Sequence, residues 1–545
     1  MTTPTTVRQD GDHTDVHYEA DGVYAVLADL DRPCYVVGSG GRVGVTPHPP
    51  GPGNGTTLLA VAAPQPPERL GSSDFRRRHG LRYAYMAGAM AGGIASEELV
   101  LRLARAGYLA SFGAAGLPED RVDQALARLA RSLGGTGTPY ACNLIHHPVS
   151  PEQERACVDA CLRHRVPCVE ASAFVRLTPD LVRYRLTGLR RDSAGGVRAE
   201  HRVVAKVSRQ EVAELFMRPA PEDLVADLVA RGEVTQLQAE LARHLPMADD
   251  ITVEADSGGH TDRRPLVVAL PAILRLRDRV AREHPSAERI GIGAAGGIAT
   301  PEAITAAFTL GACYVVTGSV NQSATEAGTS PGVKRLLAQA GLTDYTMAPA
   351  ADLFEQGGTV QVLSRGTRFA GTAARLYRLY REHAGLDELP ARERRDVEER
   401  ILRRPLATAW QDTADYLLAH QPDWHRRAEQ DPKYRMAMVF RWYLAMASRW
   451  AISGAEERRG DWQIWCGPAM GAFNGWTAGT ALALPDNRQV VSIADHLMRA
   501  AAFHTRVTQL RVTGLRLPAA CAAYRCPPCD PRARRRRPRP PRPRS

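Results

Sequence analysis

Short apolar runs alternate with longer amphipathic stretches between about residues 81 and 318, and this alternation constrains the fold of the chain. The longer stretches, such as 96–107 and 118–134, repeat apolar residues at i, i+3, i+4 and i+7, as amphipathic helices do. Eight of the short runs resemble buried strands, namely 83–87, 108–112, 140–144, 167–171, 202–207, 250–255, 289–295 and 314–318. Because strands that alternate with helices form parallel sheets, we predict a (β/α)8 TIM barrel. A doubly wound open sheet is the main alternative.

The sequence on either side of the barrel has a different pattern. Residues 1–70 are rich in Gly and Pro and predict an irregular or small β-containing region, so we place the barrel at 71–340. Beyond it, amphipathic segments such as 367–385 and 433–451 predict a helical domain at 341–518. The aromatic and Met side chains of 433–451 form a broad apolar face, which we interpret as core and not as a cofactor site.

The net charge of +11 comes mostly from the end of the chain. Residues 531–545 hold eight arginines and no acid, so 11 − 8 leaves +3 for the rest. We interpret 519–545 as a disordered Pro/Arg tail, and nucleic-acid binding is the less favoured interpretation. Cys521, Cys526 and Cys529 lie in this segment, but one CxxC pair without a second pair predicts no zinc site.

The N-terminus and the cysteines indicate a cytoplasmic protein. The first residues are polar and acidic, with no apolar segment behind a basic one, and no apolar run is long enough to span a bilayer. Ten cysteines in 545 residues do not form a disulfide scaffold. Cys142, Cys168 and Cys313 lie inside apolar runs, where they are expected to be small buried hydrophobes.

Two glycine-type loops follow the last two predicted strands. The segment 291–303 leads from a strand into Gly296–Gly297 and then into a helix, and the segment 315–323 leads into Gly318–Ser319. Glycines allow backbone N–H groups to approach a phosphate, and a helix N-terminus favours an anion. Barrels often bind phosphate after strands seven and eight, so the pair of loops predicts a phosphate site.

Polar residues follow other predicted strands at the same end of the barrel. His260, after Gly258 and Gly259, is a candidate proton or hydrogen-bond donor. Asn143 ends the third predicted strand and Lys206 the fifth, where a lysine ammonium could stabilise an anionic ring. Small residues after the first strand, in 85–93, would let a flat ring stack on the backbone. A structural role remains the alternative for His260, and a surface position for Lys206.

At these sites the sequence resembles the PfaD-type trans-acting enoyl reductases of polyketide and polyunsaturated fatty acid synthases, which are relatives of nitronate monooxygenases. The resemblance covers roughly residues 34–515. It is carried by the segments 70–100, 138–148, 206–209, 253–265, 291–303, 317–330, 361–380 and 464–476. The last two lie outside the barrel and are the most specific, because many flavin barrels share glycine-rich phosphate loops.

The resemblance implies FMN as the cofactor and NADPH as the source of electrons. His260 falls where nitronate monooxygenases carry a His, although the chain reads DSGGHTD where those enzymes read EAGGH. The implied flavin contacts are Ala87, Gly88 and Met90 along the ring, Asn143 and Lys206 at its edge, Gly258 and Gly259 close to it, and Gly296, Gly297, Gly318 and Ser319 at the phosphate.

The activity implied is reduction of α,β-unsaturated acyl thioesters carried by an acyl carrier protein. Carrier proteins are acidic, so Arg365 and Arg368 are candidate docking residues, with a solvated helix start as the alternative. A flavin-dependent nitronate oxidase is the second interpretation. A non-catalytic protein with a nucleic-acid-binding tail is the third. Oligomeric state, including a homodimer, is left open.

Overall fold

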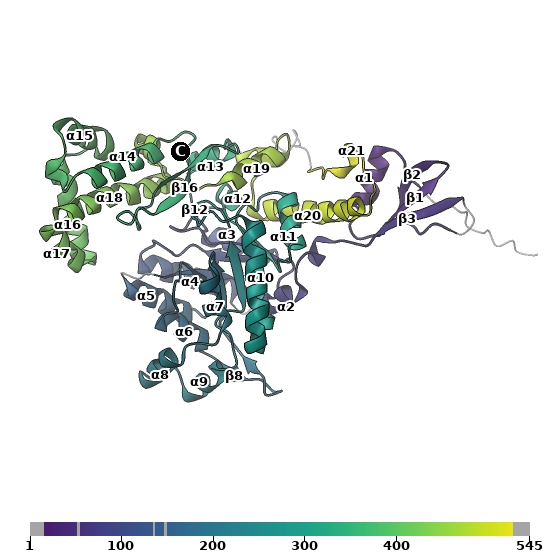
Figure 1. Ribbon diagram of the computed structural model, residues 1–545, viewed down its shortest axis with the longest axis horizontal. Helices are drawn as coiled ribbons and strands as arrows, with labels where there is room; N and C mark the ends of the chain where they lie inside the picture. The colour runs from purple at the N-terminus through teal and green to yellow at the C-terminus, as the bar shows by residue number, and fades with distance from the viewer. Residues whose placement is uncertain (1–15, 52–54, 135–136, 147–149, 527–545) are drawn as a thin grey trace, which may run out of the picture. The chain divides into compact units, whose positions relative to one another are not determined.

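The computed structural model describes residues 16–51, 55–134, 137–146 and 150–526 of the chain (Figure 1). Within these residues the chain forms two compact units. The first, here called the N-terminal unit, combines residues up to 70 with residues from 495 onward, and the second, the barrel unit, covers 71–494. Each unit is described by itself.

The barrel unit contains a closed barrel of eight parallel strands, which confirms the predicted fold. The strands follow chain order around the barrel, as a (β/α)8 barrel requires. They are β4 (Tyr85–Ala87), β5 (Leu109–Phe112), β6 (Ala141–Ile145), β7 (Cys168–Ser172), β10 (Arg202–Val207), β11 (Asp250–Glu254), β13 (Gly291–Ala295) and β14 (Val315–Thr317). Each one coincides with one of the eight apolar runs in the sequence.

Helices surround this barrel because the crossovers are amphipathic, as their sequences predict (Figure 1). Ser96 caps α3 by accepting a hydrogen bond from the N–H of Leu99, and Thr300 caps α11 through the N–H of Ala303. The helices are α3 (Glu97–Arg105), α4 (Glu119–Leu133), α5 (Pro151–Arg163), α6 (Pro179–Leu186), α7 (Gln210–Met217), α8 (Glu222–Ala230), α9 (Gln236–Ala242), α10 (Leu266–Glu283), α11 (Pro301–Thr309), α12 (Ser319–Gln322) and α13 (Pro331–Ala338).

Helix α2 (Ser73–His79) closes the amino-terminal end of the barrel. Its Phe75 ring stacks on Tyr314 at 4.1 Å between centroids, inside the barrel core. Arg78 and His79 both contact Asp250, the first residue of β11, at 2.6 and 2.7 Å. Because this end is filled and tied down by α2, the opposite end, where the strands terminate, is left for a binding site.

Beyond the barrel, two strands precede the helices. The strand β16 (Thr359–Leu363) is the middle of a three-stranded sheet and pairs on one side with β15 (Tyr345–Pro349) and on the other with β12 (Gly259–His260), which belongs to the loop after β11. The segment for which the sequence predicts only helices therefore begins with a small antiparallel sheet. These strands are short and are separated by Gly357 and Gly358, so the apolar alternation is too brief to stand out.

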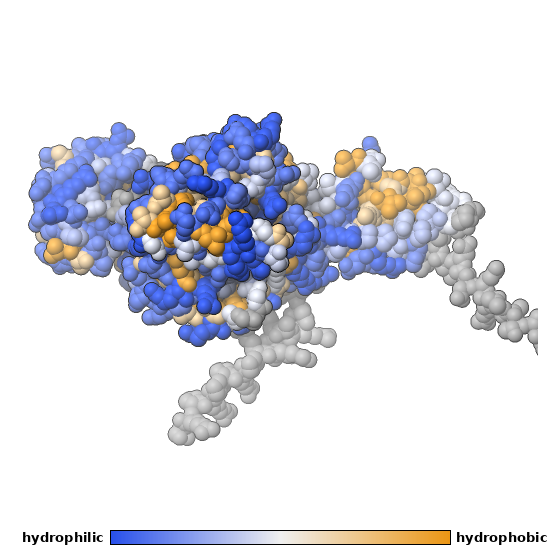
Figure 2. Space-filling model, turned by 90° about the horizontal axis from the view of Figure 1, so that it is seen from below, coloured by the Kyte–Doolittle hydropathy of each residue, from blue (hydrophilic) through white to orange (hydrophobic). Residues whose placement is uncertain are grey.

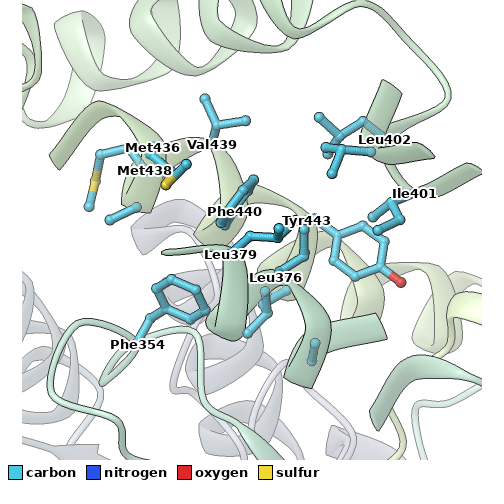
Figure 3. Close-up of a cluster of buried hydrophobic side chains, with 14 of the residues drawn as sticks. Phe354, Leu376, Leu379, Ile401, Leu402, Met436, Met438, Val439, Phe440 and Tyr443 are labelled. Atoms are coloured by element: carbon cyan, nitrogen blue, oxygen red, sulfur yellow. The ribbon is translucent and has the colours of Figure 1, made fainter. Parts of the chain in front are cut away.

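The rest of this region is helical and has its own core (Figure 3). Met436, Phe440 and Tyr443 of α18 are buried at its centre, which agrees with the interpretation of 433–451 as core. The main helices are α14 (Phe369–Glu382), α15 (Ala391–Asp396), α16 (Leu406–His420), α17 (Pro422–Gln430), α18 (Pro432–Ser453) and α19 (Pro468–Trp476).

The N-terminal unit combines both ends of the chain. Its sheet has the antiparallel order β2 (Arg42–Thr46), β1 (Cys34–Ser39), β3 (Thr56–Ala62). Helices α1 (Ala20–Ala28), α21 (Ala519–Ala522) and the later residues of α20 (Val490–Val512) complete it. Buried Arg506 of α20 donates to the carbonyls of Val26, Leu27, Asp29, Leu30, Arg32 and Ala63.

Two surface features complete the description. Val43, Leu58, Leu59 and Val61 of the N-terminal unit are each about half exposed, and Figure 2 shows apolar residues gathered on this unit. Part of the predicted tail is helical, since α21 begins at Ala519, while the Arg-rich segment 531–545 lies outside the described residues. Among the described helices, each is either too short or too polar to span a lipid bilayer.

Candidate active site

The loop after β13 holds two consecutive glycines in left-handed conformations. Gly296 and Gly297 have φ angles of +88° and +71°, which side-chain-bearing residues rarely adopt. A Cβ atom on Gly296 would lie 2.6 Å from the carbonyl group of Ala255, so this glycine permits close backbone packing. At Gly297, a Cβ atom would meet nothing within 4 Å.

The loop after β14 lies beside it, because β13 and β14 are paired strands. Gly318 stands before the short helix α12, which begins at Ser319, and a Cβ atom on Gly318 would also meet nothing within 4 Å. The hydroxyl of Thr317 is held by hydrogen bonds with the Tyr85 hydroxyl, at 2.5 Å, and with the side-chain nitrogen of Asn321, which donates to it. Two glycine turns therefore leave open backbone side by side, followed by the helix starts at which barrels bind phosphate.

The turn after β4 closes another side of the barrel mouth. Its Gly88 N–H donates to the carbonyl of Thr317 at 3.0 Å, which joins this turn to the β14 loop. A Cβ atom on Gly88 would lie 2.9 Å from Val316, so only glycine fits without movement. Ala87 and Met90 flank this turn, and whether a flat ring packs against it stays a prediction.

Asn143 and Lys206 come from nearby strands of the same barrel. The side-chain nitrogen of Asn143 donates to the carbonyl of Glu170 and to the hydroxyl of Ser172, each at 3.1 Å, so its orientation is fixed. The ammonium of Lys206 lies 3.2 Å from the carboxylate of Glu254. Burial lowers the pKa of Lys206, but the charges of Glu254 and Glu170 outweigh burial and raise it, so the amine stays a cation.

Glu170, in the middle of β7, was not singled out from the sequence. It is fully buried, and its Oε2 accepts a hydrogen bond from the N–H of Ala89 at 2.8 Å. Its Oε1 has no hydrogen-bond partner among the described residues and lies 3.5 Å from where a Cβ atom of Gly88 would be. An unpartnered buried carboxylate oxygen is costly, so this atom has an unused capacity to accept a hydrogen bond at the mouth. The only signal in the sequence was an acid inside an apolar run.

His260 lies farther out, in β12. Its Nε2 atom is 2.9 Å from Asp352, and 53 % of its side chain is exposed. Burial lowers the pKa of His260, but the hydrogen bond and charge of Asp352 outweigh burial and raise it. Glu254 and Lys206 also influence this pKa, which places the imidazole within electrostatic reach of the mouth. The neighbouring Gly258 packs so closely on Cys466 that a Cβ atom would be 2.9 Å from its backbone, while Gly259 has a φ of +88°.

The predicted docking arginines lie in the region beyond the barrel. Arg365 is exposed and forms an ion pair with Asp344 at 3.0 Å. Arg368 precedes α14 and borders a cavity of about 530 Å³. The cavity is also lined by Gly371, Thr372, Arg375, Glu399, Arg400, Ile401, Arg403 and Asp461. Four arginines against two acids give this cavity a net positive lining.

Two of the three cysteines of the predicted tail lie within the described residues. Cys521 is buried in α21 and Cys526 is partly buried, whereas Cys529 lies outside the described residues. The convergent group of possible metal ligands among the described residues is a different one, formed by Cys142, Cys157 and Cys161.

Three protein-family models match parts of this chain. The nitronate monooxygenase family model matches residues 79–352, and the N-terminal domain model of the fatty acid synthase component PfaD matches 10–64. The model of the inserted helical domain of [acyl-carrier-protein] S-malonyltransferase matches 383–462. The chain therefore belongs to the nitronate monooxygenase family of flavin-dependent oxidoreductases, in the group that carries a PfaD N-terminal domain.

The similar proteins have names from fatty acid and polyketide biosynthesis. The chain is 46 % identical over 449 residues to a component of the polyunsaturated fatty acid synthase of Thraustochytrium sp., covering 81 % of this chain and 30 % of that protein. It is 45 % identical over 431 residues to polyketide biosynthesis protein PksE of Bacillus subtilis, covering 79 % and 56 % respectively. The enoyl reductase domain of MlnA from Bacillus amyloliquefaciens superposes with a TM-score of 0.78 at 38 % identity, covering 82 % of this chain and all of that domain. The chain thus spans at most 56 % of these two full-length relatives.

Proposed function

We propose that this chain reduces α,β-unsaturated acyl thioesters carried in trans by an acyl carrier protein of a polyketide or polyunsaturated fatty acid synthase, with FMN and NADPH. The observation that carries the proposal is the pair of open glycine turns at Gly297 and Gly318, next to a barrel mouth that holds the Lys206 cation. The likeness to the MlnA enoyl reductase domain supports the same chemistry.

The residues present fit FMN. The turns at Gly296–Gly297 and Gly318–Ser319 would hold its phosphate, since a Cβ atom at Gly297 or Gly318 would fill the open space there. The turn at 87–90 would support the ring, and Glu170 Oε1 offers an acceptor beside it. When bound, and once NADPH has reduced the flavin, FMN would supply a hydride for the β-carbon of the substrate.

The chain's own groups supply charge and a proton. Lys206 is held as a cation, so it can stabilise negative charge that develops near the mouth. His260 carries a raised pKa through Asp352, so a larger share of it is protonated at neutral pH and can donate a proton to the α-carbon. The roles proposed for His260 and Lys206 are thus the same as those expected from the sequence.

The carrier protein is proposed to dock at the positive surface near Arg365 and Arg368. Replacing both by Ala should raise KM for a carrier-bound crotonyl thioester several-fold and leave a carrier-free crotonyl thioester unaffected, because rim charges act on encounter. An equal rise in KM for the carrier-bound and the carrier-free thioester would show that these arginines do not take part in docking of the carrier protein.

The activity is tested by mixing the purified protein with FMN, NADPH and a crotonyl carrier thioester. We expect substrate-dependent loss of NADPH and formation of the saturated thioester. Turnover of alkyl nitronates with oxygen, without NADPH consumption, would instead favour a nitronate oxidase, the alternative that the family model supports.

A further inference from the structure

Three cysteine side chains converge on the outer side of the barrel. Cys142 lies in β6, while Cys157 and Cys161 lie in α5, which covers that strand. Their sulfur atoms are all within 4.8 Å of one another, and all three cysteines are free. The two helical cysteines are four residues apart and so share a helix face. Because neighbouring residues of a strand point to opposite sides, Cys142 points away from the side that Asn143 occupies.

The surroundings of the cluster favour ligand chemistry on sulfur. Cys142 and Cys161 are buried, whereas Cys157 is partly exposed, so a route from solvent exists on one side. The Cys157 sulfur lies 3.8 Å from the backbone oxygen of Asn143. Metal binding would displace the thiol protons, since the thiolate is the form that binds metal ions. The Cys142 sulfur is also 3.6 Å from the backbone oxygen of Asn143.

We propose that Cys142, Cys157 and Cys161 form a binding site for a divalent thiophilic ion of the zinc class, with three thiolate ligands. Since Zn–S bonds measure about 2.3 Å, two sulfurs on a tetrahedral zinc ion are about 3.8 Å apart, and the sulfurs of the cluster, all within 4.8 Å of one another, can reach that spacing by small side-chain movements. Sulfur ligands select against Mg²⁺ and Ca²⁺, which bind oxygen.

Charge also favours a divalent ion over a monovalent one. Three thiolates around a monovalent ion leave two uncompensated negative charges in a mostly buried site, whereas a divalent ion leaves one. The partly exposed side at Cys157 leaves room for a water as the fourth ligand, as in zinc sites with three protein ligands. Binding would tie α5 to β6 next to the backbone of Asn143, so it links this cluster to the barrel mouth.

Zinc binding by the reduced full-length protein tests the proposal. Cys526 and Cys529 are first replaced by Ser so that the C-terminal thiols cannot contribute. A chromophoric chelator then reports the zinc affinity, and metal analysis reports the stoichiometry. We expect one Zn²⁺ per chain, and at least ten-fold weaker binding in Cys157→Ser. Cys313→Ser, which removes a partly buried thiol outside the cluster, should bind zinc as the parent does.

Alkylation gives a second readout that needs no variant. In the protein without substitutions at these three positions, bound zinc should protect Cys142, Cys157 and Cys161 from alkylation by iodoacetamide. Mass spectrometry of the digested protein measures the alkylation. The absence of stoichiometric zinc in the parent protein would overturn the proposal. Equal affinity in parent and Cys157→Ser, or protection of other cysteines in place of these three, would overturn it as well.

Discussion

Replacing Gly318 by Ala separates cofactor binding from folding. Gly318 has a φ of −125°, outside the left-handed region, and its Cβ atom would meet nothing within 4 Å. A steric clash of the new Cβ atom with the protein is therefore absent. The new methyl group enters the space that the phosphate is proposed to occupy.

The magnitude follows from the hydrogen bonds that the methyl group displaces. A hydrogen bond to a charged group contributes roughly 1.5–3 kcal/mol, so losing one weakens FMN binding about 10- to 100-fold. The free energy of unfolding should fall by about 1 kcal/mol, because Gly is preferred to Ala at the residue that precedes a helix. Quenching of FMN fluorescence on titration of the flavin-free protein measures the affinity, and thermal unfolding measures stability.

Gly475→Ala is the matched control. Gly475 lies in α19, and its Cβ atom also meets nothing within 4 Å, but it belongs to neither glycine turn. This variant should bind FMN as the wild type does and be as stable or slightly more stable. Unchanged FMN affinity in Gly318→Ala, or an equal loss in Gly475→Ala, would refute the proposed phosphate cradle.

Three further predictions concern the charged groups. Asp352→Asn should lower the pKa of His260, as measured by NMR titration. Since that pKa is raised in the wild type, the stability that the His260–Asp352 pair contributes is complete below pH 6.5 and is lost as the pH rises through the pKa of the folded state. Identical NMR titrations of His260 in both proteins would contradict this. Glu170→Ala should weaken FMN binding about ten-fold, because the N–H of Ala89 loses its acceptor. Glu170→Gln should retain most of the affinity, because its amide oxygen can still accept that hydrogen bond. Equal losses of affinity in the two variants would show that the negative charge of Glu170 matters instead. Lys206→Met should lower the free energy of unfolding by about 2 kcal/mol in chemical denaturation, because it leaves the partly buried Glu254 and the buried Glu170 without a cation, and unchanged stability would argue against that contact.

The barrel could be predicted from the sequence because each of its strands is a buried apolar run between amphipathic helices. The glycine turns at Gly296–Gly297 and Gly318 could be located for the same reason, since they directly follow strands that are easily recognised. Local pattern and global fold agree in this part of the chain.

Other features depend on contacts between distant segments. The pairing of His260 with Asp352 requires β12 to join β16, and nothing in either short segment signals this partner. Glu170 resembles any polar residue in a strand until the fold brings Ala89 to its carboxylate. The three-cysteine cluster likewise needs α5 to pack on β6, and each cysteine alone is typical of a small buried hydrophobe.

A crystal structure with FMN tests the central claim most directly. We predict the phosphate within hydrogen-bonding distance of the backbone N–H groups at Gly297 and Ser319, and the ring over the turn at 87–90 beside Lys206. A phosphate bound elsewhere, with side chains filling the space at Gly297 and Gly318, would contradict the proposed site.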